Sequence, residues 1–388
     1  MSQNMRSDKE KDRIKLLITG GHLTPAIAVI ERLRKSARWD ITFMARQYGH
    51  EESRSPASEL REIPKLGVPT IAIPAGKIPR LASLKSLSPL VRIPLGFFHA
   101  FFHILLLKPD VILSFGGYVS VPAALAGWIL GIPIVTHEQT MGKGLANTLV
   151  ELLAEEIAIS WEDTRQHFRK KVVLTGNPIR EAILKGTKKP VPMKLKGAPL
   201  LYVTGGNLGS KKLNGVIRSG LKAFTENYRI IHQCGFRTGE DDYQSLDLAR
   251  NELPGERKHR YLVREWLEAE EIAWILMHAD LVISRAGANI VTELAYTGNT
   301  TLFVPLRIAG GNEQLENAKL LTSAGTAEII EEKDLTPGRL LAKVAQMLEQ
   351  SEVYRKHAPD ARRIVRTDAA KRIEEILETV YEKKNAKS

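Results

Sequence analysis

Ile14-Lys-Leu-Leu-Ile-Thr-Gly-Gly-His22 is an apolar run that ends in a glycine pair, and a helical pattern follows it at residues 25–34. The second half of the chain repeats this arrangement. There, Leu200-Leu-Tyr-Val-Thr-Gly-Gly-Asn207 precedes a helical pattern at residues 211–224. A continuously apolar strand followed by a helix is typical of a parallel sheet covered by helices. Each half is therefore predicted to contain a strand, a glycine turn and a helix in that order.

A second pair of stretches also repeats between the halves. Asp110-Val-Ile-Leu-Ser-Phe-Gly-Gly117 resembles Asp280-Leu-Val-Ile-Ser-Arg-Ala-Gly287, and further apolar strands alternate with helices along the chain. This alternation predicts an α/β protein with parallel sheets and a duplicated architecture. We place an N-terminal domain at 13–184, a proline- and lysine-rich linker at 185–199, a C-terminal domain at 200–360, and a last helix at 361–383 that returns to the N-terminal domain.

The composition fits two globular domains. Hydrophobic residues make up 43% of the 388 residues, which excludes a disordered or low-complexity chain. The net charge of +12 favours anionic partners. A single cysteine, Cys234, and a polar N-terminus without a signal-peptide pattern favour a cytoplasmic protein. The longest apolar run, 93–107, is shorter than the ~20 residues of a membrane-spanning helix, so we expect none.

Glycines and polar side chains follow the predicted strands, where parallel sheets bind their ligands. Glycine pairs beside helix N-termini suit phosphate groups, although they also fit plain turns. We therefore predict a diphosphate ligand in one cleft formed by both edges. Neither a Gly-x-Gly-x-x-Gly fingerprint nor a Gly-x-x-x-x-Gly-Lys-Ser/Thr loop is present, which weakens the dehydrogenase and P-loop hypotheses. The stretches are Gly20-Gly21-His22, Gly116-Gly117-Tyr118, His137-Glu138-Gln139, Gly176-Asn177, Gly205-Gly206-Asn207, Arg285-Ala286-Gly287 and Gly310-Gly311-Asn312.

Three single side chains have chemistry that suits a site. His22 could act as a general base, since an ordinary histidine pKa near 6.5 suits proton removal, or it could serve only the helix start. Glu293, two turns into the helix after Arg285, could bind ribose hydroxyls or simply favour the helix N-terminus. Glu138 ends an apolar strand and could contact a polar ligand or only form a loop. We expect no metal site, because His99 and His103 lack a carboxylate partner.

An aromatic stripe with basic flanks lies in the N-terminal half. Its apolar residues fall at helical spacing, and basic residues precede them. Such a helix is predicted to bind an anionic membrane surface, while a core helix with basic flanks remains the alternative. The residues of this predicted membrane seat are Lys77, Arg80, Phe98, Phe101 and Phe102.

Six motifs in order resemble the MurG family, the peripheral membrane N-acetylglucosaminyltransferases of peptidoglycan synthesis, from about residue 14 to residue 327. The resemblance implies the GT-B fold, in which two Rossmann-like domains face a cleft. The motifs are Thr19-Gly-Gly-His-Leu-Thr-Pro-Ala26, Ser114-Phe-Gly-Gly-Tyr-Val-Ser120, His137-Glu-Gln139 with Gly144-Leu-Ala-Asn147, Thr175-Gly-Asn-Pro-Ile-Arg180, and Arg285-Ala-Gly with Glu293.

The resemblance also implies an activity. It is the inverting transfer of N-acetylglucosamine from UDP-GlcNAc to the muramoyl 4-hydroxyl of lipid I, giving lipid II, at the cytoplasmic face of the cell membrane without cofactor, metal or nucleic acid. His22 and Glu138 are then two candidate catalytic bases. The implied donor-binding residues are Asn207, Arg285, Gly287, Ala288, Glu293 and Gln314. The implied acceptor-binding residues are Gly20, Gly21, Gly116, Gly117, Tyr118, His137, Asn147, Asn177 and Arg180.

The sequence departs from the family pattern at four places, one of which is Gly310-Gly311-Asn312-Glu313-Gln314 in place of a more acidic stretch before the glutamine. The first glycine loop is shorter, because Ile18 runs directly into Thr19-Gly20-Gly21. Thr140 stands where asparagine is usual, and Asn207-Leu208 stand where Ser-Gln is usual. Three other hypotheses therefore stay open: a UDP-sugar-dependent transferase with another acceptor, a UDP-GlcNAc 2-epimerase, and a non-catalytic membrane-associated scaffold.

Overall fold

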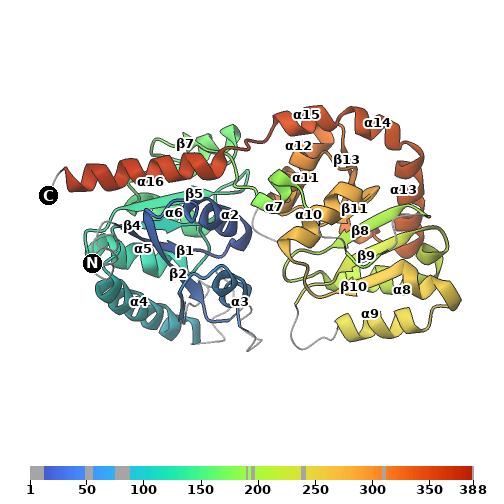
Figure 1. The fold of residues 1–388 in the computed structure, drawn as a ribbon, viewed down its shortest axis with the longest axis horizontal. Helices are drawn as coiled ribbons and strands as arrows, with labels where there is room; N and C mark the ends of the chain where they lie inside the picture. Colours follow the sequence, from blue (N-terminus) through green and yellow to red (C-terminus); the bar gives the residue numbers. More distant parts are fainter. Residues whose placement is uncertain are drawn as a thin grey trace, which may run out of the picture. The chain divides into compact units, whose positions relative to one another are not determined.

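The computed structural model describes residues 13–48, 56–74, 88–188, 191–193, 197–236, 242–307 and 312–386, with the backbone alone at 88–93. The chain divides into two compact units. The first comprises Met1–Arg180 and Arg366–Ser388, and the second comprises Glu181–Val365. Each unit contains one parallel sheet with helices packed against it, as Figure 1 shows, which confirms the predicted α/β fold class.

The sheet of the first unit has seven strands in the order β3-β2-β1-β4-β5-β6-β7, all paired in parallel. Its two central strands, β1 and β4, are the apolar runs that the sequence repeats. The strands are β1 (Ile14–Thr19), β2 (Trp39–Arg46), β3 (Thr70–Ile73), β4 (Val111–Ser114), β5 (Ile134–Glu138), β6 (Glu156–Ile159) and β7 (Val173–Leu174).

The sheet of the second unit has six parallel strands in the order β10-β9-β8-β11-β12-β13. This order is equivalent to that of the first six strands of the other sheet, with β8 and β11 at the centre. The strands are β8 (Leu200–Thr204), β9 (Arg229–Gln233), β10 (Tyr261–Arg264), β11 (Leu281–Ser284), β12 (Thr301–Phe303) and β13 (Ala327–Ile329).

The two repeated aspartates play the same part in both sheets. Asp110 Oδ2 accepts the backbone N–H of Lys15 at 2.8 Å, and Asp280 Oδ2 accepts that of Leu200, also at 2.8 Å. Each aspartate therefore ties the start of one central strand to the start of its neighbour. The repeat seen in the sequence is thus a repeat of sheet structure, which physically explains why aspartate stands at both positions.

Helices of the first unit cover both faces of its sheet. Helices α2, α3 and α16 pack together, and α4, α5 and α6 form a second group in which α5 contacts both of the others. The helices are α2 (Leu23–Leu33), α3 (Ser58–Lys65), α4 (Ser88–Leu107), α5 (Ser120–Ile129), α6 (Leu145–Leu153) and α16 (Ala369–Asn385), with a 3₁₀ helix at Glu162–His167.

The chain leaves and re-enters the first unit at points that differ from the predicted boundaries. Residue 184 falls within α7 (Glu181–Lys185), whose Leu184 carbonyl accepts the Tyr296 hydroxyl of the second unit at 3.0 Å. After α15 (Ala358–Arg363) the chain returns to the first unit, where α16 contacts α2, β4 and β6. Glu374 of α16 pairs with Arg32 of α2 at 2.7 Å.

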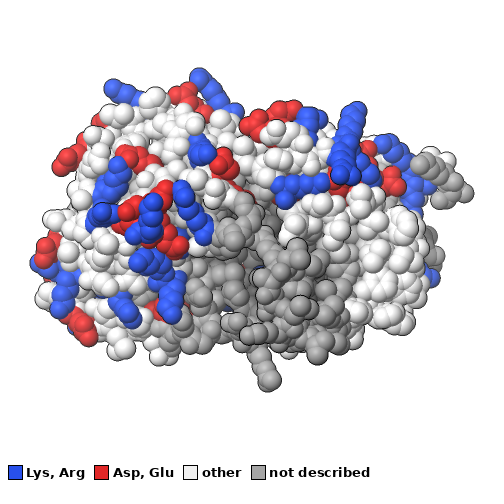
Figure 2. Space-filling view, turned by 180° about the vertical axis from the view of Figure 1, so that it is seen from behind, with Lys and Arg blue, Asp and Glu red and all other residues white. Residues whose placement is uncertain are grey.

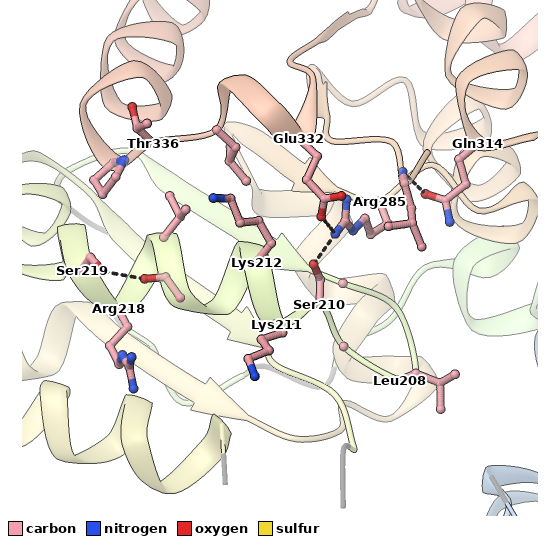
Figure 3. Close-up of a pocket in the computed structure, with 17 residues that line it drawn as sticks. Leu208, Ser210, Lys211, Lys212, Arg218, Ser219, Arg285, Gln314, Glu332 and Thr336 are labelled. Carbon is pink, nitrogen blue, oxygen red and sulfur yellow. Dashed lines mark hydrogen bonds and ion pairs between the residues drawn. The ribbon is translucent and has the colours of Figure 1, made fainter. Parts of the chain in front are cut away.

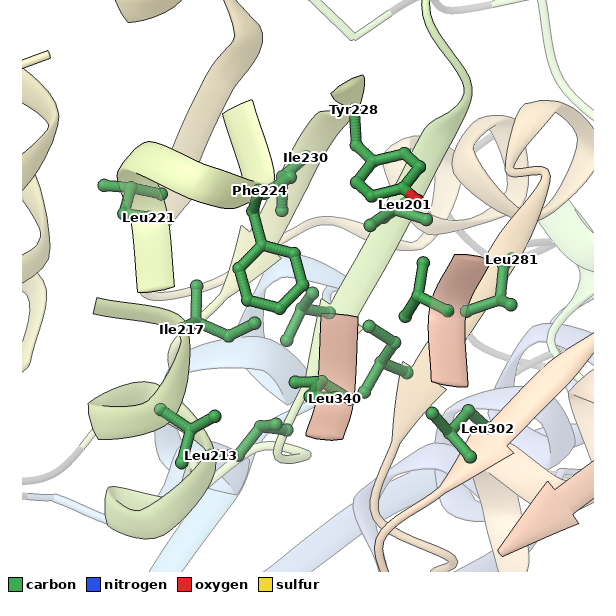
Figure 4. Packing of buried hydrophobic residues seen from close by; sticks show 14 of the residues in the cluster. Leu201, Leu213, Ile217, Leu221, Phe224, Tyr228, Ile230, Leu281, Leu302 and Leu340 are labelled. Atoms are coloured by element: carbon green, nitrogen blue, oxygen red, sulfur yellow. The ribbon is translucent and has the colours of Figure 1, made fainter. Parts of the chain in front are cut away.

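The core of the second unit lies between its sheet and the helices α8 and α13. Figure 4 shows Phe224 and Ile217 of α8 packed beside Leu340 of α13 and the strand residues Leu201 and Leu281. Side-chain caps fix where these two helices begin, because Ser210 accepts from Leu213 N and Thr336 accepts from Arg339 N. The helices are α7, α8 (Lys211–Asn227), α9 (Asp242–Asn251), α10 (Ala269–His278), α11 (Ala288–Thr297), α12 (Glu313–Ser323), α13 (Pro337–Glu349), α14 (Ser351–Lys356) and α15, with 3₁₀ helices at Gly255–Arg260 and Glu332–Asp334.

Candidate functional site

Two glycine turns interlock at the carboxyl ends of β1 and β4. The Gly21 N–H donates to the Gly116 carbonyl at 3.0 Å. A Cβ at Gly20 would lie 2.7 Å from the Phe115 Cβ, and one at Gly117 would lie 3.0 Å from the Gly21 nitrogen. Gly117 also has φ +77°, a conformation that side chains disfavour. Only glycine fits here, so the backbone of both turns can approach a ligand closely.

Helices begin directly after these two turns. α2 follows His22 and α5 follows Val119, and neither has a side-chain cap or an acidic residue in its first turn. The first N–H groups of a helix carry a partial positive charge and have no partner within the helix. This edge of the first sheet therefore suits an anion such as a phosphate group.

His22 lies at the N-cap position of α2, and its side chain caps no helix N–H group. The residue is half-buried. Burial lowers its pKa below the ordinary value, the charge of Glu138 opposes this shift, and the charge of Arg46 adds to it. A lowered pKa keeps the imidazole neutral near pH 7, which is the form that can accept a proton.

Glu138 ends β5 and is 2% exposed. Its Oε1 accepts from the Thr140 backbone N–H at 3.2 Å and from the Thr140 hydroxyl at 2.8 Å. Its Oε2 accepts from the Gly144 N–H at 2.9 Å and from Asn147 Nδ2 at 2.8 Å. Both oxygens are engaged by protein donors that shape the loop before α6. Glu138 therefore stabilises the loop between β5 and α6.

His137 and Asn147 are also engaged within the protein. His137 has no exposed surface, its Nε2 lies 2.9 Å from the Gly176 carbonyl, and its Nδ1 lies 3.0 Å from Gln139 Nε2. Burial lowers the pKa of His137 to about 4, so the ring is neutral. Asn147 Oδ1 accepts the Thr136 hydroxyl at 2.9 Å. The polar atoms of both side chains therefore bond to other parts of the protein. They hold in place the loops at the carboxyl ends of the strands, which we call the ligand edge of the sheet.

The other predicted acceptor residues lie at the same edge. Tyr118 follows the Gly116-Gly117 turn and is half-buried, whereas Asn177 and Arg180, which follow β7, are buried. Arg46 was missed by the sequence analysis: the Arg46 guanidinium carbon lies 5.8 Å from the centre of the Tyr118 ring, and its Nε lies 3.5 Å from Glu59 Oε1. No local motif marks Arg46, because its partners are distant in sequence.

A cavity of about 870 Å³ opens at the ligand edge of the second sheet. Arg285, the residue after β11, is buried in its wall and holds three segments together (Figure 3). Its Nη1 donates to the Val304 carbonyl at 2.9 Å, and its Nη2 donates to the Ser210 hydroxyl at 2.6 Å and to the Glu332 carboxylate. Arg285 thereby fixes the glycine turn before α8 against the opposite wall of the cavity.

Of the predicted donor residues, Arg285 and Gln314 line this cavity. Gln314 Oε1 accepts the Leu306 N–H at 2.9 Å, which directs the side chain to the cavity wall. Asn207 and Glu293 are outside the described lining, and Glu293 is buried in the second turn of α11. Gly287 and Ala288 begin that helix, which has neither a side-chain cap nor an acidic first turn. Sequence reasoning missed Ser210 and Glu332, since ordinary serine and glutamate residues carry no signal before they meet Arg285.

The family models match both units. The N-terminal domain of glycosyltransferase family 28 matches residues 19–159, and the family's C-terminal domain matches residues 200–376. The UDP-N-acetylglucosamine--N-acetylmuramyl-(pentapeptide) pyrophosphoryl-undecaprenol N-acetylglucosamine transferase 2 of Bacillus thuringiensis subsp. konkukian is 33% identical over 350 residues, covering 88% of this chain and 93% of that protein. The chain belongs to glycosyltransferase family 28.

Other family 28 proteins and related folds agree with this assignment. The like-named transferase of Treponema denticola is 32% identical over 82% of this chain and 83% of its own length. The crystal structure of MurG from Acinetobacter baumannii is 27% identical with a TM-score of 0.64, covering 94% of this chain and 99% of that one. A UDP-GlcNAc 2-epimerase from Neisseria meningitidis, at 16% identity and a TM-score of 0.65, covers 94% of this chain and 100% of its own and shares the fold alone. These similarities confirm the GT-B class of fold and a MurG-type glycosyltransferase.

In this family 28 glycosyltransferase the glycine turns fall within the N-terminal match and the 870 Å³ cavity falls within the C-terminal match. Within the ranges that the structure describes, no group of three or more His, Cys, Asp or Glu side chains could hold a metal ion. Among the same residues, no helix has both the length and the apolar character needed to cross a bilayer.

The aromatic residues of the predicted membrane seat on α4 fall into an exposed group and a group that packs against the core. Phe98 and Phe102 are 55% and 60% exposed. Phe101, a residue of the predicted membrane seat, instead packs with Phe97 against the core of the first unit, because successive residues of a helix point about 100° apart. Lys77 and Arg80 lie outside the described residues.

Proposed function

We propose that this chain transfers N-acetylglucosamine from UDP-GlcNAc to the muramoyl 4-hydroxyl of lipid I and so forms lipid II. The observation that carries the proposal is the match along 93% of a relative named for this transfer. In the reaction, the acceptor oxygen forms a bond to C1 of the sugar while the bond from C1 to the UDP oxygen breaks. The acceptor proton passes to a base, and UDP leaves with the electron pair.

His22 is the base in this proposal, in preference to Glu138. Its burial keeps the imidazole neutral, and it lies where the glycine turn meets α2. Glu138 has both carboxylate oxygens occupied by four donors, so proton transfer to it would break the loop that it holds. The charge of Glu138 nevertheless favours the imidazolium that forms when His22 takes the proton.

The second unit binds the donor in this proposal. The cavity that Arg285 and Gln314 line has ample room for a nucleotide sugar, since ligand pockets are commonly ~300–1,000 Å³. The uncapped N-terminus of α11, at Gly287 and Ala288, suits the diphosphate and the charge that develops on departing UDP. Glu293 on the same helix would take the ribose hydroxyls, and Asn207 on the glycine turn would face the phosphates.

The first unit binds the lipid-linked acceptor in this proposal. The backbone of Gly20, Gly21, Gly116 and Gly117 and the start of α2 would surround its diphosphate. His137 and Asn147 act as positioning residues there, because their polar atoms hold the loops behind this edge. Tyr118, Asn177 and Arg180 remain proposed acceptor contacts.

A face of the first unit would seat the enzyme on the cytoplasmic surface of the membrane. Exposed apolar side chains continue from α4 onto the adjoining helices α5 and α6. In Figure 2 the part of the first unit that is in view carries few Lys, Arg, Asp or Glu side chains over a broad area. Contiguous exposed apolar patches on proteins commonly serve as binding surfaces. The exposed residues are Leu95, Phe98, Phe102, Leu105, Leu106, Leu125, Trp128, Ile129, Leu145, Leu149 and Leu152.

A mass-spectrometric transfer assay tests the proposed reaction. The protein is incubated with UDP-GlcNAc and a short-chain lipid I analogue in mild detergent, and a product heavier by one N-acetylhexosamine is expected. The same protein with UDP-GlcNAc alone is the control, in which NMR would detect epimerisation at C2. Absence of the heavier product, with UDP-GlcNAc binding shown by calorimetry, would overturn lipid I as the acceptor.

A further inference from the structure

A buried ion pair lies at the ligand edge of the first sheet. Arg46 is the last residue of β2, with a side chain 15% exposed, and Glu59 lies in the first turn of α3, with a side chain 1% exposed. Their closest atoms, Nε and Oε1, are 3.5 Å apart, which is too long for a strong hydrogen bond. Within the described chain, this Nε has no hydrogen-bond acceptor, and the Glu59 oxygens have no donor apart from the backbone of Glu59 itself.

Burying such an ion pair has an unfavourable desolvation free energy. Burying a charged group without hydrogen bonds loses its hydration, and the attraction between the two charges repays that loss only partly. Burial accordingly raises the pKa of the Glu59 carboxyl, while the Arg46 charge opposes this shift. The pair therefore does little for stability, and its position suggests another use.

The strand order indicates that Arg46 and Tyr118 meet near the first glycine turn. β1 lies between β2 and β4 in the sheet, and Tyr118 follows β4. Arg46, at the end of β2, nevertheless lies 5.8 Å from the centre of the Tyr118 ring. The two side chains therefore meet near the carboxyl end of β1, which leads into the turn that contains Gly20, Gly21 and His22. The effect of its charge on the pKa of His22 agrees with this position.

Arg46 stays protonated in its buried position. Although burial opposes it, the charges of Glu59 and Tyr118 and a hydrogen bond with Tyr118 hold the pKa of Arg46 above its ordinary value. Glu59 and Tyr118 contact the guanidinium from different elements, so the side chain is held in place before any ligand arrives. A preorganised guanidinium loses less conformational entropy when it binds an anion.

We infer that Arg46, held by Glu59, is a further acceptor-binding residue whose guanidinium donates to the diphosphate between the acceptor sugar and its lipid. This inference rests on the proposed function. The charge of Arg46 acts on His22, so the two residues lie at the same edge of the sheet, where the reacting hydroxyl and the diphosphate of one acceptor sugar would both be bound. It also adds a cation where the glycine turn is shorter than the MurG pattern, so a side chain supplies donors that the short loop cannot. Guanidinium groups match phosphate oxygens in a bidentate geometry.

Calorimetry with geranyl diphosphate tests this site directly. The full-length protein is first saturated with UDP, so that the site in the second unit is filled. Arg46→Gln is expected to raise the dissociation constant for geranyl diphosphate by about tenfold or more, and Arg46→Lys to recover part of it. The matched control is Arg38→Gln, at the residue directly before β2, where a half-exposed arginine pairs with Glu378, and it is expected to change affinity by less than about twofold.

Glu59→Gln separates direct contact from a structural effect. It removes the buried charge with little change of volume, and Tyr118 still contacts Arg46, so affinity for geranyl diphosphate is expected to stay within about threefold. Equal loss in Glu59→Gln and Arg46→Gln would mean that the pair acts only through structure, and unchanged affinity in Arg46→Gln would equally overturn the inference. An unchanged melting temperature of the first unit in scanning calorimetry establishes that each variant is folded.

Failure of the Arg46 inference can be distinguished from failure of the proposed lipid I reaction. Lipid II synthesis with unaltered geranyl diphosphate binding in Arg46→Gln would refute the inference alone. No lipid II synthesis, with binding that depends on Arg46, would retain the diphosphate site and reject lipid I. Inorganic diphosphate in a parallel titration separates a site for the lipid-linked group from a site for any diphosphate: the inference requires geranyl diphosphate to bind at least as tightly.

Discussion

Glu138→Gln distinguishes a structural carboxylate from a catalytic base. The substitution keeps the size and shape of the side chain but replaces one oxygen by an NH₂ group, which can only donate. In the native protein each oxygen accepts two hydrogen bonds, from Thr140 on one side and from Gly144 and Asn147 on the other. Whichever way the amide turns, its NH₂ group faces two other donors.

The size of the effect follows from these contacts. Two hydrogen bonds to a charged group are lost, and each such bond contributes ~1.5–3 kcal/mol net. The two bonds that remain are made to a neutral oxygen and are weaker. We therefore expect the free energy of unfolding to fall by about 3 kcal/mol or more, because the site is 2% exposed and water cannot replace the lost acceptors. For a unit of this size, that corresponds to a fall in Tm of roughly 6–12 °C.

Scanning calorimetry and transfer kinetics measured together decide the question. Glu138→Gln should lower the melting temperature of the first unit, whereas His22→Ala should keep it nearly unchanged and lower kcat, because the His22 side chain caps no helix N–H. If Glu138→Gln melted like the native protein and lost a hundredfold or so in kcat, a magnitude typical of general-base removal, Glu138 would be the base and our reasoning would be wrong.

Three further predictions concern the proton, the donor and the membrane. Activity should fall on the acidic side with an apparent pKa below 6.5, because His22 has a lowered pKa and must be neutral to accept a proton; an acidic limb of kcat/KM with an apparent pKa above 6.5 would contradict this. Arg285→Gln should weaken UDP binding by about tenfold or more in calorimetry, since it releases the glycine turn before α8, and unchanged affinity would remove Arg285 from the site. Replacing Phe98 and Phe102 together by serine should reduce flotation with anionic vesicles by about tenfold or more, whereas serine at Leu248, an equally exposed apolar residue of the second unit, should not; equal flotation of all three proteins would refute the membrane face.

Much of the fold could be predicted because its signals are local. Continuous apolar runs mark strands that are buried on both faces, and a glycine pair after a strand marks a turn whose backbone has no room for side chains. The repeated Asp110 and Asp280 indicated a duplicated sheet before their identical hydrogen bonds were known. The resemblance to the MurG family then identified the class of enzyme, which the family models and relatives confirm.

The candidate site was only partly predictable. From the sequence, Glu138 and His22 were equally good candidates for the catalytic base, and their hydrogen bonds distinguish the two. Glu138 accepts hydrogen bonds from four donors, whereas the His22 side chain caps no helix N–H group. The same limit applied to the aromatic stripe of α4. Phe101 and Phe102 are adjacent and chemically identical, yet the first packs against the core and the second is exposed, because their directions around the helix differ.

The amino-acid sequence alone determined the two parallel α/β units, their central strands and the glycine turns at the ligand edge, since each depends on residues within a few positions of one another. The tertiary structure decided which polar side chains act together. Arg46 meets Glu59 and Tyr118, and Arg285 meets Glu332, only after separate strands assemble into a sheet. Such pairs cannot be predicted from a single sequence, because the same residue type occurs both buried and exposed. Only the fold determines which charged side chains lose their contact with water and pair with each other.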